Sequence, residues 1–112
     1  MIIKTGVDLL PIHKIGSQLH DEKFLNLNFH PFERHSMDVT RLASIYALKE
    51  CVFKALDIVE RDWLLIEVFF SAKGKPRINL SKKIILTNLE SMDCSVSFEN
   101  GYVLANVVIL LK

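Results

Sequence analysis

The stretch from Asp38 to Ile58 constrains the fold more than any other, because its 21 residues contain neither glycine nor proline and can form one principal helix. Its alanines and leucines favour a helix, and Asp38 stands where N-cap residues are preferred. Apolar residues at helical spacing predict one broad buried face. They are Leu42, Ile45, Leu48, Val52, Ala55 and Leu56. We therefore predict a long central helix against which the remaining elements pack.

A second stripe of the same helix is polar. Tyr46, Glu50 and Lys54 are spaced four residues apart, so they lie along one line that is separate from the apolar face. A glutamate followed four residues later by a lysine is the favourable order, worth about 0.3–0.5 kcal/mol on a helix surface. Spacing alone therefore indicates nothing more than an ordinary surface pair.

The composition is that of a globular protein. The chain has 112 residues, of which half are hydrophobic and about a quarter charged, so we expect a single domain over residues 1–112. A formal net charge of +1 gives no general attraction to nucleic acid. No apolar run approaches the roughly 20 residues of a membrane span, and the N-terminal run soon meets Asp8, so we expect a cytoplasmic protein without a membrane partner.

The two cysteines, Cys51 and Cys94, show no CxxC spacing. Free thiols are the rule in the cytoplasm, where disulfides rarely persist. Free cysteine is also among the most often buried residue types. We therefore predict two buried free thiols and no disulfide bond.

The N-terminal segment Met1–Leu10 is rich in strand formers and predicts a strand. Asp8 interrupts its apolar character, and a carboxylate buried alone is expensive. It can lie at the strand's end, find a partner, bind a cation, or cap a short helix that begins at Pro11. The residues themselves leave these alternatives open. The helix after Pro11 is expected to turn Ile12 and Ile15 inward.

Two short pieces connect this helix to the central one. The segment Asp21–Phe29 is expected to turn Phe24, Leu27 and Phe29 inward, and Phe32-Glu33 is expected to begin another helical turn. The four histidines of the chain lie between Ile12 and Asp38, and His30 and His35 have a spacing that zinc sites use. No CxxC pair or HExxH pattern supplies further ligands, so we interpret the histidines as surface residues.

The C-terminal half predicts mainly strands. Asn100-Gly101 between two apolar runs is a strong hairpin signal. The expected elements are strands at Trp63–Ser71 and Arg77–Leu80, a helix at Ser81–Ser91 carrying Ile84, Ile85 and Leu89 (with a strand as the alternative), and strands at Cys94–Phe98 and Tyr102–Leu111. This order predicts an α+β fold in which an antiparallel sheet packs against a long central helix, with short helices near the N-terminus.

No single motif defines a chemistry. The chain lacks the glycine-rich phosphate-binding patterns GxGxxG and GxxxxGK[ST] and the GxSxG nucleophile elbow. The candidate groups are distributed along the chain. They are Asp8, the pair Glu50 and Lys54, Gly74-Lys75-Pro76, and the segment Ser95–Glu99.

Taken together and in order, these motifs resemble the holo-acyl-carrier-protein synthase family, the small 4′-phosphopantetheinyl transferases. That family has Gly-x-Asp in its first strand, a basic residue in the next helix, a Lys-Glu-Ala-x-x-Lys-Ala-like helix motif, an aromatic residue before Ile-Glu-Val, and Gly-Lys-Pro. The matching segments are Gly6–Asp8, Lys14, Lys49–Ala55, Trp63 with Ile66–Val68, and Gly74–Pro76. The resemblance covers nearly the whole chain and implies the 4′-phosphopantetheinyl transferase-like fold.

The resemblance implies a reaction and a metal. Members of this family move the phosphopantetheine arm of coenzyme A to a serine of an apo acyl carrier protein, and they release adenosine 3′,5′-bisphosphate. A hard divalent cation held by oxygen ligands neutralises the charge of the pyrophosphate. The resemblance implies that this cation is Mg²⁺ and that Asp8 and Glu50 are its protein ligands.

The remaining roles are also implied by the resemblance. Lys54 would stabilise the leaving phosphate, and Glu50 would remove the serine proton, directly or through a water on the metal ion. Lys14 would contact the acidic carrier protein, and the protein would form a homotrimer. The residues expected to contact coenzyme A are Lys49, Lys54, Gly74, Lys75, Pro76 and Ser97.

Three positions depart from the family pattern. Phe98 stands where a histidine follows Ser-x-Ser, Ile45 stands where an arginine is expected, and Lys4 replaces a glycine. Losing two phosphate-binding groups would weaken coenzyme binding by roughly a few kcal/mol unless Lys4, Lys49 or Arg41 compensates. A non-catalytic carrier-binding or assembly module on the same fold therefore stands as the alternative to an active transferase. The choice between a fatty-acid and a polyketide carrier stays open.

Overall fold

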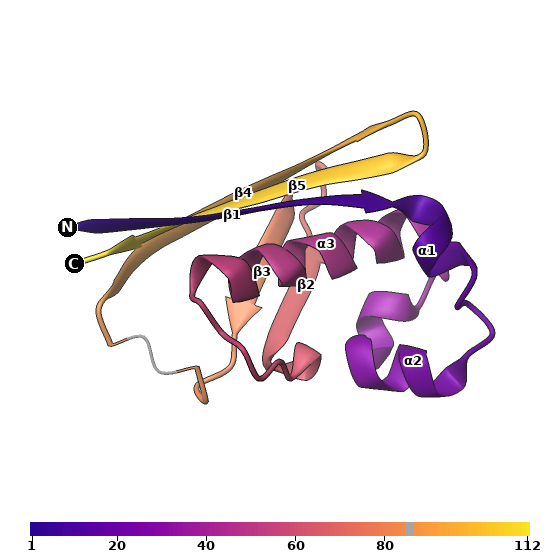
Figure 1. The fold of residues 1–112 in the computed structure, drawn as a ribbon, viewed down its shortest axis with the longest axis horizontal. Helices are drawn as coiled ribbons and strands as arrows, with labels where there is room; N and C mark the ends of the chain where they lie inside the picture. The colour runs from indigo at the N-terminus through magenta and orange to yellow at the C-terminus, as the bar shows by residue number, and fades with distance from the viewer. Residues whose placement is uncertain (85–86) are drawn as a thin grey trace.

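In the computed structural model, which describes residues 1–84 and 87–112, the long helix α3 (Val39–Ala55) lies under a three-stranded sheet (Figure 1). The other elements are β1 (Ile2–Pro11), α1 (Ile12–Gly16), α2 (Glu22–Asn28), β2 (Ile66–Phe70), β3 (Pro76–Leu80), β4 (Leu89–Glu99) and β5 (Tyr102–Leu111), with 3₁₀ turns η1 (Pro31–Arg34) and η2 (Trp63–Leu65). The predicted α+β fold, with antiparallel strands, a long helix and short N-terminal helices, is confirmed.

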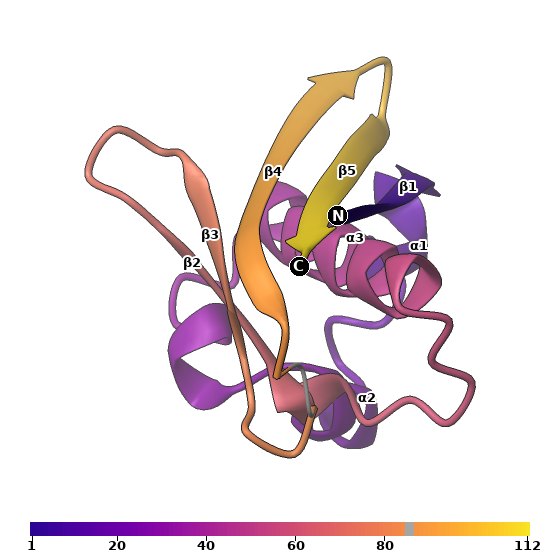
Figure 2. The same cartoon turned by 90° about the vertical axis from the view of Figure 1, so that its left-hand side faces the viewer.

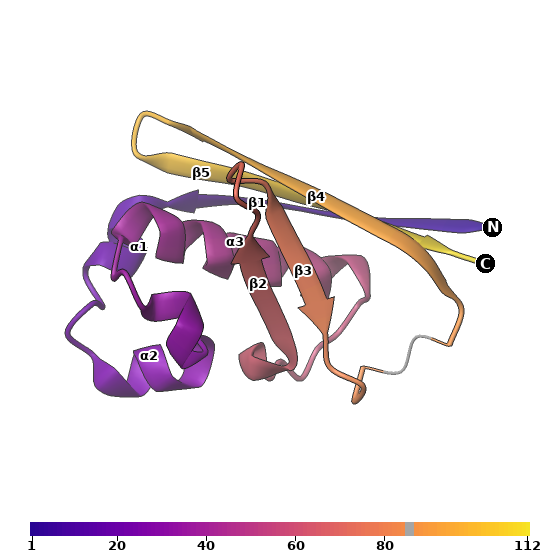
Figure 3. The same cartoon turned by 180° about the vertical axis from the view of Figure 1, so that it is seen from behind.

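The main sheet has the strand order β1-β5-β4, and all of its pairs are antiparallel. The N-terminal strand therefore pairs with the C-terminal strand, from Ile2 opposite Leu111 to Pro11 opposite Tyr102. Strands β2 and β3 form a separate antiparallel hairpin that crosses α3, with β3 beside β4 (Figures 2 and 3). Alternate residues of β5 supply the core beneath the sheet. They are Val103, Ala105, Val107 and Ile109.

The central helix begins where the sequence predicts. The Asp38 side chain accepts hydrogen bonds from the backbone N–H groups of Thr40 and Arg41, at 2.9 and 3.2 Å. The helix ends at Ala55, three residues before the predicted end at Ile58. Asp57 has a positive φ of 56°, a backbone conformation that cannot continue a right-handed helix.

Several predicted element boundaries are wrong. Residues 63–65 form a 3₁₀ turn, because the Asp62 side chain accepts a hydrogen bond from Leu64 N, so β2 starts at Ile66. No helix is found in the described part of 81–91. Residues 81–83 lie in turns, Leu89 already belongs to β4, and Ile85 lies outside the described residues. Pairing of β4 with β5 as far as Leu111 draws the end of this segment, from Leu89 on, into the sheet.

The burial of α2 also differs from the prediction. Leu27 is 57% exposed, whereas Leu25 and Phe29 are buried. Residues 25 and 29 are one helical turn apart and face the core together, and Leu27 falls between them on the outer side. The turn expected at Phe32-Glu33 is present as η1.

Two smaller predictions are confirmed. Asn100 and Gly101 both have positive φ, 51° and 78°, as a tight two-residue hairpin requires. Cys51 and Cys94 are buried free thiols.

Within the described residues, no helix is both long and apolar enough to cross a bilayer.

Candidate active site

The site is created by a close approach of β1 to α3 that depends on Gly6. A Cβ atom at this position would overlap the backbone carbonyl of Cys51 on the helix. Glycine alone lacks that atom, so the strand can lie directly on the helix backbone. Because alternate strand residues share a face, Asp8 then points to the same side as Gly6, toward the helix. The Gly-x-Asp pattern therefore brings a carboxylate to α3.

Asp8 meets Lys54 there. The Lys54 ammonium lies 3.1 Å from Asp8 Oδ1 and donates a second hydrogen bond of 3.1 Å to the backbone oxygen of Val7. The Asp8 side chain is 15% exposed and that of Lys54 is 44% exposed, so the pair lies at the edge of the protein. Of the alternatives for Asp8, the structure therefore shows an ion-pair partner, Lys54, and Asp8 caps no helix.

Glu50, one helical turn before Lys54, has a different cation. Arg61 Nη1 donates to Glu50 Oε1 at 2.6 Å, although 11 residues separate them in the chain. Both side chains are partly buried, with 18% of Glu50 and 32% of Arg61 exposed. The helix surface pair expected between Glu50 and Lys54 is therefore replaced by two pairs, each formed with another element.

Three of the predicted site residues line one cavity of about 290 Å³ between β1, α1 and α3. The residues lining it are Asp8, Leu9, Leu10, Lys14, Ile15, Gln18, Tyr46 and Glu50. Both predicted metal ligands and the predicted carrier-binding lysine therefore meet at one opening. Lys54 reaches it through its bond to Asp8.

The carboxylates of this cavity retain oxygens that can bind a cation. Asp8 Oδ1 and Glu50 Oε1 are engaged, but Oδ2 and Oε2 accept no hydrogen bond from any described residue. No buried side-chain oxygen among the described residues lacks a partner, so these two oxygens are open to solvent. Two carboxylate oxygens with room for water suit a hard divalent cation such as Mg²⁺.

Tyr46 forms the aromatic wall of the cavity. Its ring stacks on Trp63 with centroids 4.3 Å apart and an interplanar angle of 17°. Burial, and then the negative charges of Glu50 and Asp8, raise the pKa of Tyr46 above its usual value. A phenol is protonated at neutral pH in any case, so Tyr46 offers a hydrogen-bond donor at the wall of the cavity.

Lys49, predicted to contact coenzyme A, has no access to the surface. Its side chain is fully buried, and its ammonium donates to Glu33 Oε1 and to Asn28 O, both at 2.8 Å. Five residues turn an α-helix by about 140° beyond a full circle, so Lys49 and Lys54 point in different directions. We therefore correct this assignment, because Lys49 is a structural residue of the interior.

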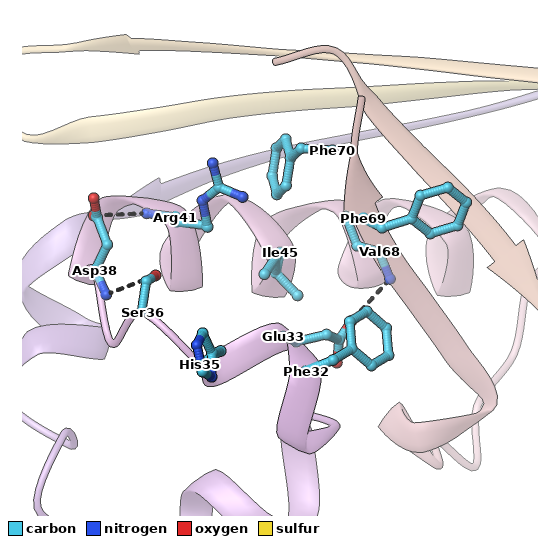
Figure 4. A pocket seen from close by; sticks show the side chains of 10 residues that line it. All are labelled: Phe32, Glu33, His35, Ser36, Asp38, Arg41, Ile45, Val68, Phe69 and Phe70. Carbon is cyan, nitrogen blue, oxygen red and sulfur yellow. Dashed lines mark hydrogen bonds between the residues drawn. The ribbon is translucent and has the colours of Figure 1, made fainter. Parts of the chain in front are cut away.

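A second hollow lies at the start of α3, between η1 and β2 (Figure 4). It measures about 370 Å³, and Arg41 stands over the Phe70 ring, with the guanidinium carbon 4.4 Å from the ring centroid. Ile45, which replaces the family's arginine, is buried against this hollow. A neighbouring cavity of about 260 Å³ also contains Arg41, together with Gly74 and Phe98. Gly74, which is predicted to contact coenzyme A, and Phe98, which replaces the family's histidine, therefore line one cavity with Arg41.

The other predicted coenzyme contacts are dispersed. Lys75 pairs with Asp93 at 3.0 Å and donates to Cys94 O at 3.1 Å. The hydrogen bonds from Lys75 and from Cys94 N lower the pKa of Asp93. Pro76 is buried at the start of β3, and Ser97 lies on the exposed side of β4. One chain therefore does not gather all of these residues into a single pocket.

Comparison with known proteins identifies the family. A model of the 4′-phosphopantetheinyl transferase superfamily matches residues 4–107. The chain is 38% identical to a holo-[acyl-carrier-protein] synthase of Helicobacter pylori, covering 93% of this chain and 94% of that protein. It is 28% identical to the enzyme of the same name from Campylobacter jejuni, covering 96% and 100%.

Solved structures agree with this match. The crystal structure of Helicobacter pylori holo-[acyl-carrier-protein] synthase in complex with coenzyme A has a TM-score of 0.84 and 30% identity, covering 95% of this chain and 99% of that one. The synthase from Bacillus anthracis in complex with coenzyme A (3′,5′-ADP) has a TM-score of 0.78 and 26% identity, covering 95% and 94%. The chain belongs to the 4′-phosphopantetheinyl transferase superfamily, and it is a member of the holo-acyl-carrier-protein synthase family.

Sequence analysis did not find two residues of the cavity region, Arg61 and Gln18. Arg61 lies in the loop after α3, and its spacing from Glu50 follows no helical or strand period. Gln18 comes from the turn after α1. Only the return of the chain past its own helix brings Arg61 to Glu50, so no local pattern could have predicted it.

Proposed function

We propose that this protein transfers the 4′-phosphopantetheine arm of coenzyme A to a serine of an apo acyl carrier protein. The serine oxygen forms a bond to the β-phosphorus, the bond from that phosphorus to the bridging oxygen breaks, and adenosine 3′,5′-bisphosphate leaves. The observation that carries the proposal is the cavity in which Asp8 and Glu50 present open carboxylate oxygens beside Lys54, in a chain of this family.

The residues of the cavity fit the steps of that reaction. Glu50 would accept the serine proton directly or through a water molecule, because its Oε2 has no donor among the described residues and is open to solvent. Lys54 is a point charge for the phosphates and stays mobile enough to leave Asp8, since nearly half of it is exposed. A Mg²⁺ held by Asp8 and Glu50 would neutralise the negative charge of the pyrophosphate.

Lys14 is the proposed contact to the carrier protein. It is exposed on α1 and lines the rim of the same cavity as Asp8 and Glu50. A cation at this rim attracts an acidic partner and guides its serine toward the carboxylates. Fatty-acid and polyketide carriers both have this chemistry, and the assay below compares them.

For coenzyme A we propose a binding surface built from Gly74, Lys75 and Ser97, with Arg41 as the compensating cation, whereas Pro76 is buried and supports the turn from within. Arg41 and Gly74 line a common cavity, where Arg41 offers the planar donor fork that phosphate groups prefer. Phe98 supplies an aromatic surface in the same place. These groups and the carboxylates line different cavities of one chain, so we infer that a neighbouring subunit completes the site.

The surface for such an assembly is the outer face of the main sheet. Large apolar side chains stand exposed on it, including Val7 at 58%, Leu9 at 62% and Leu104 at 49%. Leu9 and Leu104 are directly paired across β1 and β5, so they form a continuous patch. We propose that this face forms the homotrimer.

The assembly is tested by light scattering after gel filtration. Leu104→Glu should convert the trimer to a monomer, because it buries a charge in the patch. Val59→Glu, in an exposed loop away from the sheet, is the matched control and should leave the trimer intact. A wild-type protein that elutes as a monomer would remove the trimer proposal.

The reaction is tested by incubating the protein with coenzyme A, Mg²⁺ and a panel of apo carrier proteins, and by weighing the carriers. A carrier that gains one phosphopantetheine supports the proposal. Glu50→Gln should abolish transfer while the protein stays folded, whereas Glu90→Gln, exposed on β4, should transfer normally. If every carrier keeps its apo mass but still binds, the chain is a non-catalytic carrier-binding module. The replacement of the family's arginine by Ile45 and of its histidine by Phe98 motivates this alternative.

The match over residues 4–107 supports one transferase domain for residues 1–112. The cytoplasmic location stays a prediction.

A further inference from the structure

Arg61 contacts a proposed metal ligand, Glu50, and no sequence motif explains this contact. It comes from the loop that follows α3, and its guanidinium reaches back to Glu50. The inference below rests on the proposed function, because it takes Glu50 as a ligand of the metal ion. It concerns how this chain holds that ligand in place.

Arg61 is itself held by two further contacts. Its Nε donates to the backbone oxygen of Ile58 at 3.4 Å, and its guanidinium carbon lies 5.4 Å from the centre of the Phe53 ring. Trp63, two residues later, packs edge-on against the same Phe53 ring at 5.0 Å. Ile58 N also donates to Phe53 O on the helix at 2.9 Å, so the loop is attached to α3 both before and after Arg61, which limits the positions that its guanidinium can take.

The contact between Arg61 and Glu50 uses only one carboxylate oxygen. Arg61 Nη1 donates to Oε1 at 2.6 Å, and Oε2 remains without a partner among the described residues and open to solvent. Asp8 shows the same division, since Lys54 takes Oδ1 and leaves Oδ2. Each carboxylate therefore has one oxygen fixed by a cation and one oxygen open to a ligand.

We propose that Arg61 is a positioning residue, which fixes the Glu50 carboxylate so that Oε2 is presented to the divalent cation. A carboxylate that already accepts a charge-assisted hydrogen bond has fewer orientations to lose when it binds a metal. Lys54 lacks such anchoring, because it is more exposed and its other contact is the backbone beside Asp8. Arg61 acts on the affinity for the metal and does not touch the substrate.

The test measures Mn²⁺ binding by electron paramagnetic resonance, with coenzyme A present and no carrier protein, so that no turnover occurs. The binding of Mn²⁺ by coenzyme A alone is subtracted. Arg61→Ala should weaken Mn²⁺ binding about 10- to 100-fold, the usual effect of removing a group that orients a metal ligand. Arg61→Gln keeps a donor without its charge and should give an intermediate affinity.

The matched control is Arg34→Ala. Arg34 also pairs with a glutamate, Glu22 at 3.6 Å, but on α2 away from the cavity, so its loss should leave Mn²⁺ binding unchanged. A purely structural role for Arg61 would lower the melting temperature without changing the affinity of the folded protein. Unchanged or tighter binding in Arg61→Ala, or an equal loss in Arg34→Ala, would overturn the proposal.

The same titration separates this inference from the proposed reaction. If Mn²⁺ binds and depends on Arg61 but no carrier is modified, the positioning role stands and the transfer reaction fails. If carriers are modified and Arg61→Ala binds Mn²⁺ like the wild type, the reaction stands and the positioning role fails. If the wild-type protein binds no Mn²⁺, Glu50 is not a metal ligand and the inference is overturned.

Discussion

The two sides of α3 carry similar ion pairs in opposite environments. Lys49 and Glu33 are both completely buried, whereas Lys54 and Asp8 lie at the edge of a cavity. In the buried pair both carboxylate oxygens are used, because besides Lys49 Nζ, Glu33 accepts hydrogen bonds from His30 N and Val68 N, each at 2.8 Å. In the open pair one oxygen of Asp8 has no partner among the described residues.

This difference separates structural charge from functional charge. A buried ion pair whose carboxylate oxygens are both used joins four elements, here α2, η1, α3 and β2, and no solvent-open oxygen is left for a ligand. A half-exposed pair adds little to stability, because water screens it, but its groups can exchange partners. The same types of side chain, five residues apart on one helix, are therefore expected to respond to substitution in opposite ways.

The largest effect is expected at the buried pair, Lys49 and Glu33. Lys49→Met should lower the free energy of unfolding by about 3–5 kcal/mol, because it leaves the Glu33 carboxylate buried without its cation. Urea unfolding followed by circular dichroism measures the loss. The double variant Lys49→Met with Glu33→Gln should recover part of it, since the amide removes the charge and still accepts a backbone N–H. If Lys49→Met alone were as stable as the wild type, the buried pair would not be structural.

The next effect is expected between the two sides, where β1 lies on α3. Gly6→Ala should lower the free energy of unfolding by about 1–3 kcal/mol, because the added methyl group overlaps the Cys51 carbonyl and pushes the strand away. The displacement also moves Asp8, so transfer activity should fall in the protein that remains folded. The matched control is Gly16→Ala, where the new atom meets only a Val39 methyl group at 3.5 Å. Equal stability losses at the two glycines would contradict this account.

A smaller effect, gradual with pH, is expected at Cys51. Burial raises the pKa of the Cys51 thiol from 9.0 to about 12. Between these values the unfolded chain releases a proton that the folded protein retains, so stability is full below pH 9.0 and decreases as the pH rises through that window. The expected slope is at most about 1.4 kcal/mol per pH unit.

Urea unfolding of the wild type and Cys51→Ala at several alkaline pH values tests this. The wild type should lose stability faster than the variant, and the difference gives the contribution of the thiol. Parallel curves would show that Cys51 is not held neutral by the β1–α3 contact.

The smallest change in stability is expected at the open pair, Lys54 and Asp8. Lys54→Ala should alter the free energy of unfolding by less than about 1 kcal/mol, as is usual for pairs near the surface. Its transfer rate should nevertheless fall about 100-fold or more, because the lysine no longer stabilises the phosphates. Urea unfolding and the carrier mass assay measure the two quantities. A large loss of stability would show that this pair is structural too.

Sequence analysis found the elements that local rules control. The Asp38 cap, the Asn100-Gly101 turn and the alternating strand β5 all follow from side-chain chemistry over a few residues. The helix expected at 81–91 failed at its end, because from Leu89 on the chain pairs with β5 and this pairing overrides the local helix preference. Leu27 failed because the tertiary structure, and not the pattern, chose which face of α2 is covered.

For the candidate site, the sequence by itself determined the residue types: the Gly-x-Asp of β1, the Glu and Lys one turn apart on α3, and the resemblance that assigns them a reaction. It did not determine which charges are available. Lys49 and Lys54 are equivalent in the sequence motif, and only the packing of η1 and β2 against α3 buried the first. Likewise only the tertiary structure brought Arg61 to Glu50. Local rules act over one turn of chain, whereas burial and ion pairing depend on segments that meet only when the whole chain has folded.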